Sequence, residues 1–310
     1  GVLAVTIKMQ ATFKEIARLK QETGKTKKYM ALIDSDIYDN TDEGIVENFE
    51  TVKIEFVNVS FKYPGSDTFV LNDLSFTIGS FEKTALVGIN GSGKTTIVKL
   101  ISGLYAPTLG KILVNGKDIT TLNREQLRKH MSVVFQDVNI YAATVLENIT
   151  GENPSEQEKR RALQALKEVG MYDKVMSLKN QENHQLLKII DETGTDLSGG
   201  EIQKIAIARA LYKENTKLII LDEPTAALDA IAEKEIYEKF NDMMENKTAI
   251  MISHRLASTK FCDTILFLEK GTILEKGSHQ ELMSLENGKY KEMFVTQGKY
   301  YKEGGDEDEM

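Results

Sequence analysis

Short apolar runs alternate with longer amphipathic stretches along most of this chain. Runs rich in β-branched and aromatic residues predict strands at residues 53–61, 69–78, 83–88, 111–116, 131–136, 217–223, 247–253 and 264–271. Several runs are apolar throughout, which is typical of parallel strands covered on both faces. The first strands follow one another without a helix, which predicts an antiparallel flap. Residues 154–211 have a mainly helical pattern, so the chain predicts an α/β fold with a mainly parallel sheet and an inserted helical subdomain.

The two ends of the chain follow different patterns. Residues 1–33 keep apolar positions at a rough spacing of three to four between Lys and Glu, which predicts a helix. Residues 34–51 are acidic and rich in turn formers, which predicts a linker. Residues 294–310, which end in KEGGDEDEM, predict a disordered acidic tail. The main domain is therefore expected at residues 52–293.

Composition narrows the class of protein. The chain has 310 residues, 41% of them hydrophobic, which is ordinary for a globular protein with a buried core. A net charge of −8 disfavours a nucleic-acid binder that relies on a broad basic face. The lone Cys262 has no internal disulfide partner, which fits a reducing cytosol. No apolar run reaches the roughly 18–20 residues of a membrane span, and the opening run lacks the features of a secretory signal, so the segment is expected to be soluble.

The strongest motif is GINGSGKTT at residues 88–96. It matches G-x-x-x-x-G-K-[ST], and it follows an apolar strand and precedes a helical run. Such a loop turns its backbone N–H groups toward a phosphate chain at the start of a helix. Lys94 would reach the β- and γ-phosphates, and the Thr95 hydroxyl would ligate Mg²⁺. The candidate nucleotide-binding residues of this loop are Gly88, Ile89, Asn90, Gly91, Ser92, Gly93, Lys94, Thr95 and Thr96.

Two acids follow the apolar run KLIIL at residues 217–221. A buried strand that delivers acids at its carboxyl end suits a site at the edge of a parallel sheet. Asp222 would hold Mg²⁺ through water, and Glu223 would polarise the attacking water for hydrolysis of a nucleoside triphosphate. GTP is disfavoured as the substrate, because the stretch NKTA at residues 246–249 lacks the Asp of the guanine motif N-K-x-D.

The stretch LSGGEIQKIAIARAL at residues 197–211 places Ser198, Gly199 and Gly200 where a helix begins, which is a further anion site. Together with the phosphate loop and the Asp-Glu strand, it resembles the signature motif of the ATP-binding cassette (ABC) ATPases, which are P-loop NTPases. The resemblance covers residues 52–293 and includes every motif of that family in order. Glu201 departs from it, because many members have Gln at this position.

The resemblance assigns further roles. Tyr63 in FKYPG would stack on adenine, and Gln136 in VVFQD would touch Mg²⁺ and link the ATP site to a membrane partner. His254 in ISHR would sense the γ-phosphate and position the attacking water with Glu223. Asp229 in AALD would be the acid of the dimer loop. The other histidines match no motif and are expected to be structural: His130, His184 and His279.

The resemblance also implies a paired arrangement. Two cassettes of this family pair head to tail, with each ATP between the phosphate loop of one and the signature motif of the other. Ser198 and Gly200 would therefore contact the ATP that the partner holds. ATP favours the closed pair and its hydrolysis opens the pair. Whether the partner is a second copy or a different cassette is left open.

Within the family, the segment that follows the Gln136 loop has a version typical of exporters. The stretch ATVLENIT at residues 143–150 is similar to that version. In exporters the cassette follows six transmembrane helices, so residues 1–33 would be the end of the last one, in a chain that is cut upstream; the alternative is an amphipathic helix packed on its own domain. One departure is IIDETGTDLSGGE at residues 189–201, where many exporters have T-x-V-G-E-x-G before the signature. Glu192 and Gly194 are present in a different order, which puts coupling through this segment in question.

These features predict the motor domain of an exporter, which hydrolyses ATP with Mg²⁺ at the cytoplasmic face of the cell membrane. Its expected partners are a transmembrane domain and a second cassette. Nucleic acid is not expected as a partner. One alternative is the separate ATPase subunit of an importer, against which the roughly fifty leading residues count. The other is a soluble ABC ATPase that acts on ribosomes or DNA, which the unbroken cassette and the acidic charge disfavour. The cargo, whether peptide, lipid or drug, is left open.

Overall fold

A computed structural model describes residues 44–189, 192–225, 230–253 and 256–303. The chain divides into two compact units, Gly1–Gly44 and Ile45–Met310, and the account below is of the second unit. The predicted helix at residues 1–33 and the linker up to residue 43 lie outside the described residues. Among the described residues, no helix is both long enough and apolar enough to cross a membrane.

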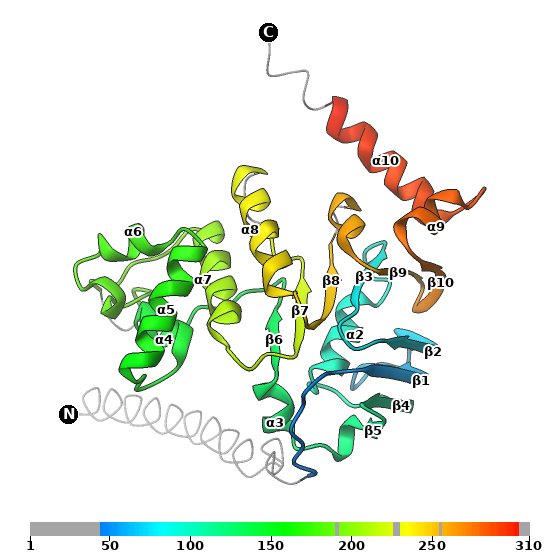
Figure 1. Cartoon of the computed structure of the whole chain (residues 1–310), viewed down its shortest axis with the longest axis horizontal. Coiled ribbons are helices and arrows are strands. Elements are labelled where there is room, and N and C mark those ends of the chain that lie inside the picture. The colour runs from blue at the N-terminus through cyan, green and yellow to red at the C-terminus, as the bar shows by residue number, and fades with distance from the viewer. Residues whose placement is uncertain (1–43, 190–191, 226–229, 254–255, 304–310) are drawn as a thin grey trace, which may run out of the picture. The chain divides into compact units, whose positions relative to one another are not determined.

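A six-stranded sheet with the order β10-β9-β3-β8-β7-β6 forms the centre of this unit (Figure 1). Its parallel strands are β3 (Lys83–Gly88), β6 (Met131–Val134), β7 (Leu218–Asp222), β8 (Thr248–Ile252) and β9 (Thr264–Glu269). β10 (Thr272–Gly277) joins β9 in an antiparallel hairpin. Every residue of β7 and β8 is buried, as expected of apolar strands covered on both faces.

A second, four-stranded sheet with the order β2-β1-β4-β5 is antiparallel, as the flap was predicted to be. Its strands are β1 (Ile54–Phe61), β2 (Leu71–Ile78), β4 (Leu109–Val114) and β5 (Lys117–Asp118). The sequence pattern missed two strands, β5 and β10. β5 has only two residues, and β10 alternates half-buried with exposed positions and has little apolar content.

The helices belong to three groups. The first follows the strands near the centre: α2 (Lys94–Ile101), η2 (Ile119–Thr121), α3 (Arg124–Lys129), α8 (Ala230–Met243) and η4 (Leu256–Phe261). The second is the predicted helical subdomain, which gathers beside β6 in Figure 1: α4 (Val145–Thr150), α5 (Glu156–Glu168), α6 (Tyr172–Met176), η3 (Gln181–Asn183) and α7 (Gly199–Tyr212). The third closes the chain: α9 (His279–Ser284) and α10 (Lys289–Glu303).

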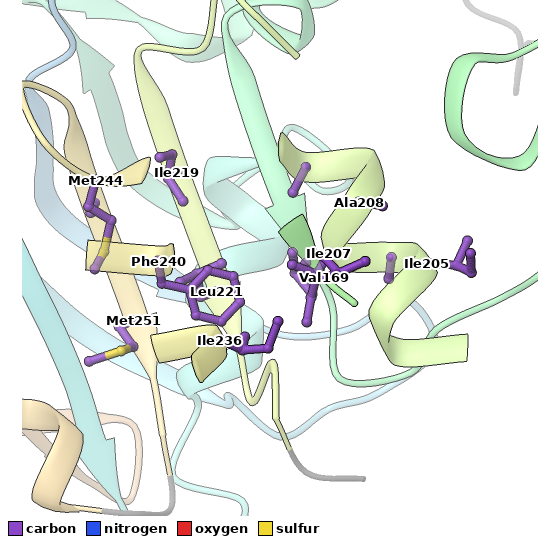
Figure 2. Packing of buried hydrophobic residues seen from close by; sticks show 14 of the residues in the cluster. Val169, Ile205, Ile207, Ala208, Ile219, Leu221, Ile236, Phe240, Met244 and Met251 are labelled. Carbon is purple, nitrogen blue, oxygen red and sulfur yellow. The ribbon is translucent and has the colours of Figure 1, made fainter. Parts of the chain in front are cut away.

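Alternate residues of β7 face two hydrophobic cores. Ile219 and Leu221 pack in a cluster with α7 and α8, where Figure 2 shows Leu221 beside Phe240. Leu218 and Ile220 belong to the other cluster, with α2 and the antiparallel sheet. A fully buried side chain of this size stabilises the fold by about 1.5–3 kcal/mol relative to an exposed one. The apolar run that predicted β7 is therefore explained by burial on both faces of the sheet.

Both predicted boundaries of the main domain are corrected. At the start, Phe49 is 2% exposed and packs edge-on against His130, so the end of the predicted linker belongs to the domain. At the end, α10 continues to Glu303, so a disordered tail from residue 294 is wrong for residues 294–303. Tyr290 is buried and Phe294 is partly buried against the core, which gives this helix an apolar side that the acidic ending obscured. Residues 304–310 lie outside the described residues.

Candidate nucleotide site

The phosphate loop turns from the end of β3 into α2, and a neighbouring backbone or side-chain atom lies too close for a Cβ at two of its glycines. A Cβ at Gly88 would lie 2.1 Å from the Leu268 carbonyl oxygen, and one at Gly93 would lie 2.5 Å from Leu71 Cδ2. Gly93 also has φ +107°, in the region that side chains other than glycine avoid. At Gly91 no atom lies within 4 Å of an added Cβ, so the loop is open on that side. The loop is therefore closely packed at Gly88 and Gly93 and open to solvent at Gly91.

Polar groups of this loop fit a phosphate chain. Lys94 Nζ donates to the carbonyl oxygens of Gly88 at 2.8 Å and Ile89 at 3.0 Å. Burial lowers the pKa of Lys94, and the carboxylates of Glu223 and Asp222 oppose that shift. The buried Ser92 hydroxyl has no hydrogen-bond partner among the described residues. A buried hydroxyl and a buried ammonium group are the kinds of donor that phosphate oxygens accept.

The two predicted acids lie where β7 ends. Asp222 is fully buried, and Glu223 takes a left-handed backbone conformation with φ 50°. The Glu223 N–H donates to the Ile252 carbonyl at 3.0 Å, which ties the acid to the end of β8. Such a conformation in a residue other than glycine costs about 1–3 kcal/mol and is concentrated at functional sites. Here it turns the chain sharply directly after the strand.

The structure brings several predicted residues together at this edge. β8 lies between β3 and β7, so the phosphate loop and the acid pair follow strands separated by one neighbour. Gln136, which comes shortly after β6, donates from Nε2 to Glu223 Oε2 at 3.0 Å. Thr95 lies half-buried at the start of α2. Two predicted residues lie outside the described residues: Asp229 and His254.

Tyr63 lies beside the first turn of α2. Its hydroxyl is 3.0 Å from Thr96 Oγ1, and Lys99 Nζ lies 5.5 Å from the centre of its ring. Phe61 and Tyr105 pack edge-on against the ring. A hollow of about 460 Å³ adjoins it and is lined by residues 61–67, Tyr105, Ala106 and Thr108. The predicted adenine-stacking residue is therefore fixed next to the phosphate loop and borders an open hollow.

The signature stretch forms the start of α7. Ser198 is the N-cap and shares a capping box with Glu201, in which the Ser198 N–H donates to Glu201 Oε2 at 2.9 Å. Glu201 Oε1 also pairs with Lys174 of α6 at 2.8 Å. The Lys174 hydrogen bond and then the Ser198 N–H lower the pKa of the Glu201 carboxyl. Ser198 and Gly199 are exposed and Gly200 is partly exposed, so the anion-binding end of this helix faces solvent.

Sequence reasoning missed two residues that support the site. The Gly271 N–H, in the β9–β10 turn, donates to the Ser92 carbonyl at 3.2 Å, and a Cβ there would lie 2.2 Å from the Val70 carbonyl. A glycine between two strand-like runs was an available hairpin signal. Gln203 Nε2 donates to the Glu223 carbonyl at 3.3 Å. No sequence signal could have found Gln203, because its partner is brought to it only by the fold.

The remaining histidines have structural partners, as expected. His184 Nε2 lies 2.9 Å from Thr195 Oγ1, and His130 Nδ1 lies 3.2 Å from the Asn215 carbonyl oxygen. His279 Nδ1 lies 2.7 Å from the Tyr290 hydroxyl. Within the described part of the chain, no group of three or more His, Cys, Asp or Glu residues could hold a metal ion.

Comparisons with known proteins agree with this geometry. The family model described as ABC transporter matches residues 71–226, about half of the chain. ABC transporter B family member 14 of Arabidopsis thaliana is 41% identical over 75% of this chain and 18% of its own length. The beta-(1-->2)glucan export ATP-binding/permease protein NdvA of Bartonella henselae is 36% identical over 84% of this chain and 43% of its own length. The ATP-dependent lipid A-core flippase of Methylobacillus flagellatus is 38% identical over 79% of this chain and 41% of its own length.

A solved structure agrees as well. A bacterial Atm1-family ABC exporter with ATP bound superimposes with a TM-score of 0.76 and 31% identity, over 90% of this chain and 48% of its own. The chain thus spans less than half the length of each of these relatives. It belongs to the ABC transporter family and forms the ATP-binding, ATP-hydrolysing domain of that family. Its predicted likeness to the exporter branch is confirmed.

Proposed function

We propose that this domain is the motor of an exporter, which binds ATP with Mg²⁺, hydrolyses it in a head-to-tail pair and drives transport through a transmembrane domain at the cytoplasmic face of the membrane. The observation that carries the proposal is the sheet edge where the phosphate loop and the acids of β7 converge. There Gln136 is hydrogen-bonded to Glu223, and Lys94 lies in the field of both acids. No nucleic acid is proposed as a partner, in line with the net charge of −8.

ATP would be held along α2 and beside Tyr63. The backbone N–H groups of residues 88–96 and the charged Lys94 would bind the phosphates, and the Ser92 hydroxyl would gain the partner that it lacks among the described residues. The Tyr63 ring would stack on adenine, because its hydroxyl bond to Thr96 fixes it beside the loop. The nucleotide would thus span the phosphate loop and the segment after β1 that carries Tyr63.

The residues present also fit Mg²⁺. The Thr95 hydroxyl and the Gln136 amide would bind it, and Asp222 would bind it through water. When bound, the ion would neutralise charge on the phosphate oxygens. Small oxygen donors and one buried acid suit this ion, which keeps several waters and rarely uses a cage made only of protein.

Glu223 is the proposed general base. Its carboxylate would take a proton from the water that attacks the γ-phosphate. The Gln136 amide that donates to Glu223 Oε2 orients this carboxylate, and the Gln203 bond to the Glu223 carbonyl holds its backbone. His254 would position the same water, since it follows β8, the strand between the phosphate loop and the acid pair.

Pairing would complete the site. Ser198, Gly199, Gly200 and Glu201 start a helix whose anion-binding end is exposed, so they are proposed to meet the ATP of a partner domain, either a second copy or a different one. Asp229 is proposed to lie at the same interface. The γ-phosphate would then bridge two helix N-termini, and its loss on hydrolysis would favour opening.

The test of the ATP site is Glu223→Gln, which keeps the shape of the side chain and removes the base. We expect ATP binding to be retained, turnover to fall about 10²-fold or more, and the pair to accumulate in ATP and Mg²⁺. The matched control is Glu286→Gln, an exposed acid on the surface. Sedimentation should be measured with two copies joined by a flexible linker, because the linker raises the effective concentration of the partner. A linked Glu223→Gln protein that hydrolyses ATP at the wild-type rate, or never closes, contradicts the proposal.

The export part of the proposal has its own test. The coding DNA upstream of Gly1 is expected to encode six apolar segments of about 20 residues each, the last of which runs into residues 1–33. A start codon directly upstream would instead indicate a separate ATPase subunit. That outcome would overturn export by a fused transporter and leave the ATP site intact.

A further inference from the structure

The segment that follows the proposed switch histidine is held by the C-terminal helices. η4 begins at Leu256, two positions after His254 in the chain, and it packs against α10. The Leu256 N–H donates to Gln297 Oε1 at 3.1 Å, and its carbonyl accepts from Thr259 Oγ1 at 2.7 Å. Leu256 is 1% exposed, so water is a poor substitute for these side-chain partners.

A chain of buried hydroxyl groups connects the same carbonyl to α9. The Tyr290 hydroxyl lies 2.8 Å from Thr259 Oγ1 and 2.7 Å from His279 Nδ1. Thr259 and Tyr290 are both 0% exposed. This series of hydrogen bonds therefore runs from His279 through two fully buried side chains to the backbone of the segment after His254.

The directions of these hydrogen bonds are determined. A carbonyl oxygen can only accept, so Thr259 donates its single hydroxyl proton to Leu256. Thr259 must then accept from the Tyr290 hydroxyl, and Tyr290 in turn accepts from His279, whose proton lies on Nδ1. Each hydroxyl both donates and accepts, so the loss of one leaves a buried group unsatisfied at each break.

α10 is itself anchored at its start, near the Tyr290 hydroxyl that takes part in these hydrogen bonds. The Glu275 carboxylate on β10 accepts from the backbone N–H groups of Lys289 and Tyr290, which caps the start of α10. One turn further, Phe294 packs against the His279 ring with 4.9 Å between centroids. Figure 1 shows α10 leaving the domain beside α9, so its first turns are the part that is tied to the domain.

We propose that α9 and α10 position the segment carrying His254, with Thr259, Tyr290 and Gln297 as positioning residues for hydrolysis. This inference rests on the proposed function, because it acts through His254. The residues lie outside the nucleotide-binding elements, so ATP binding does not depend on them. They hold η4, which begins two positions after residue 254 in the chain.

The test compares hydrolysis kinetics of Thr259→Val and Thr259→Ser. Val keeps the shape and removes the hydroxyl, whereas Ser keeps the hydroxyl. We expect Thr259→Val to lower kcat about tenfold with KM for ATP changed less than about twofold, since a small misplacement of a catalytic group is costly. Thr259→Ser should stay within about twofold of the wild type in both. Tyr172→Phe on α6, a matched loss of a hydroxyl elsewhere, should change neither.

A second background separates positioning from general damage. In a chain that already carries His254→Ala, Thr259→Val should lower kcat by less than about twofold, because the positioned group is gone. An equal loss in both backgrounds, or an unchanged kcat in the single variant, overturns the inference. Should Thr259→Val fail to fold, Tyr290→Phe and Gln297→Leu test the same prediction. If Glu223→Gln keeps wild-type turnover, the proposed function has failed, and that result is distinct from these.

Discussion

The phosphate loop and the signature stretch each lead through glycines into a helix, yet the domain holds them in different ways. Ser92, Gly93 and Lys94 are buried, and the loop is supported by parts of the chain far away in sequence, such as Leu268 and Gly271. Ser198 and Gly199 are exposed, and the capping box that holds them spans only four residues. One helix start is built into the core, and the other is presented at the surface.

The caps of the two helices differ in the same sense. α2 has Gly93 as its N-cap and makes no side-chain cap hydrogen bond, so its first N–H groups are available to a ligand. α7 has Ser198, whose side chain already accepts from the Glu201 N–H. A helix start prepared for its own nucleotide therefore leaves its cap to the ligand. The start of α7, which is proposed to meet the nucleotide of a partner, is capped by its own side chain.

The largest effect is expected at the buried helix start, in the phosphate loop. Gly88→Ala should abolish ATP binding and destabilise the domain by about 3 kcal/mol or more, because the new Cβ would lie 2.1 Å from the Leu268 carbonyl oxygen. Binding of a fluorescent ATP analogue and urea unfolding measure the two effects. Gly116→Ala is the control, since it also has positive φ but no atom within 4 Å. It should lose about 1–2 kcal/mol and keep ATP binding, and equal losses in the two variants would contradict the clash.

The next effect concerns the exposed side. Ser198→Ala should leave ATP binding by the single domain unchanged and weaken ATP-dependent pairing about tenfold, because a hydrogen bond to a charged ligand is lost. The lost cap should also destabilise the domain by about 1 kcal/mol. Ser155→Ala is a matched control, since Ser155 caps α5 through the same capping box with Glu158. Sedimentation with ATP should separate the two variants, and equal pairing would contradict the partner role.

The local patterns predicted most of the fold and of this comparison. β7 is apolar up to its final acid and β3 is apolar after its first two residues, so their burial on both faces could be expected from residue type. The capping box at the start of α7 was also readable, because Ser198 and Glu201 match S/T-x-x-E. Features that depend on a few neighbouring residues were therefore accessible before the fold was known.

The features that could not be predicted depend on distant neighbours. Phe49 belongs to the domain because the fold places His130 against it. Gly271 supports the phosphate loop only because the β9–β10 turn reaches Ser92. The role of Gln203 requires the end of β7 beside α7. Supports of the buried helix start are of this kind, so sequence reasoning located the phosphate loop and missed what holds it.

A smaller effect on ATP affinity is expected at Tyr63, which lies beside the phosphate loop. Tyr63→Phe removes the hydroxyl bond to Thr96 and keeps the ring, so ATP affinity should change less than about threefold. Tyr63→Ala removes the stacking surface and should cost about 1–3 kcal/mol of binding energy. Titration with ATP measures both. If Tyr63→Phe lowered ATP affinity as much as Tyr63→Ala, the hydroxyl bond to Thr96, rather than the ring alone, would be needed for binding.

The smallest effect concerns the ion pair that supports the exposed side. Glu201→Gln keeps a capping-box residue and removes the charge that pairs with Lys174, so stability at neutral pH should fall by less than about 1 kcal/mol. The pKa of Glu201 is held below its ordinary value of 4.5, chiefly by the Lys174 hydrogen bond. The wild-type advantage is therefore complete above that ordinary value and is lost as the pH falls through the lower folded-state pKa.

Urea unfolding of the two proteins at neutral pH, and at several pH values below 4.5, measures this advantage. It should shrink as the carboxylate is protonated, and it should also shrink in high salt, because the pair is partly exposed. Lys174→Met should reproduce the loss and make Glu201→Gln nearly neutral when the two are combined. An advantage that is independent of pH would mean that the capping box alone holds the start of α7. The surface support of this helix would then be even more local than its ion pair suggests.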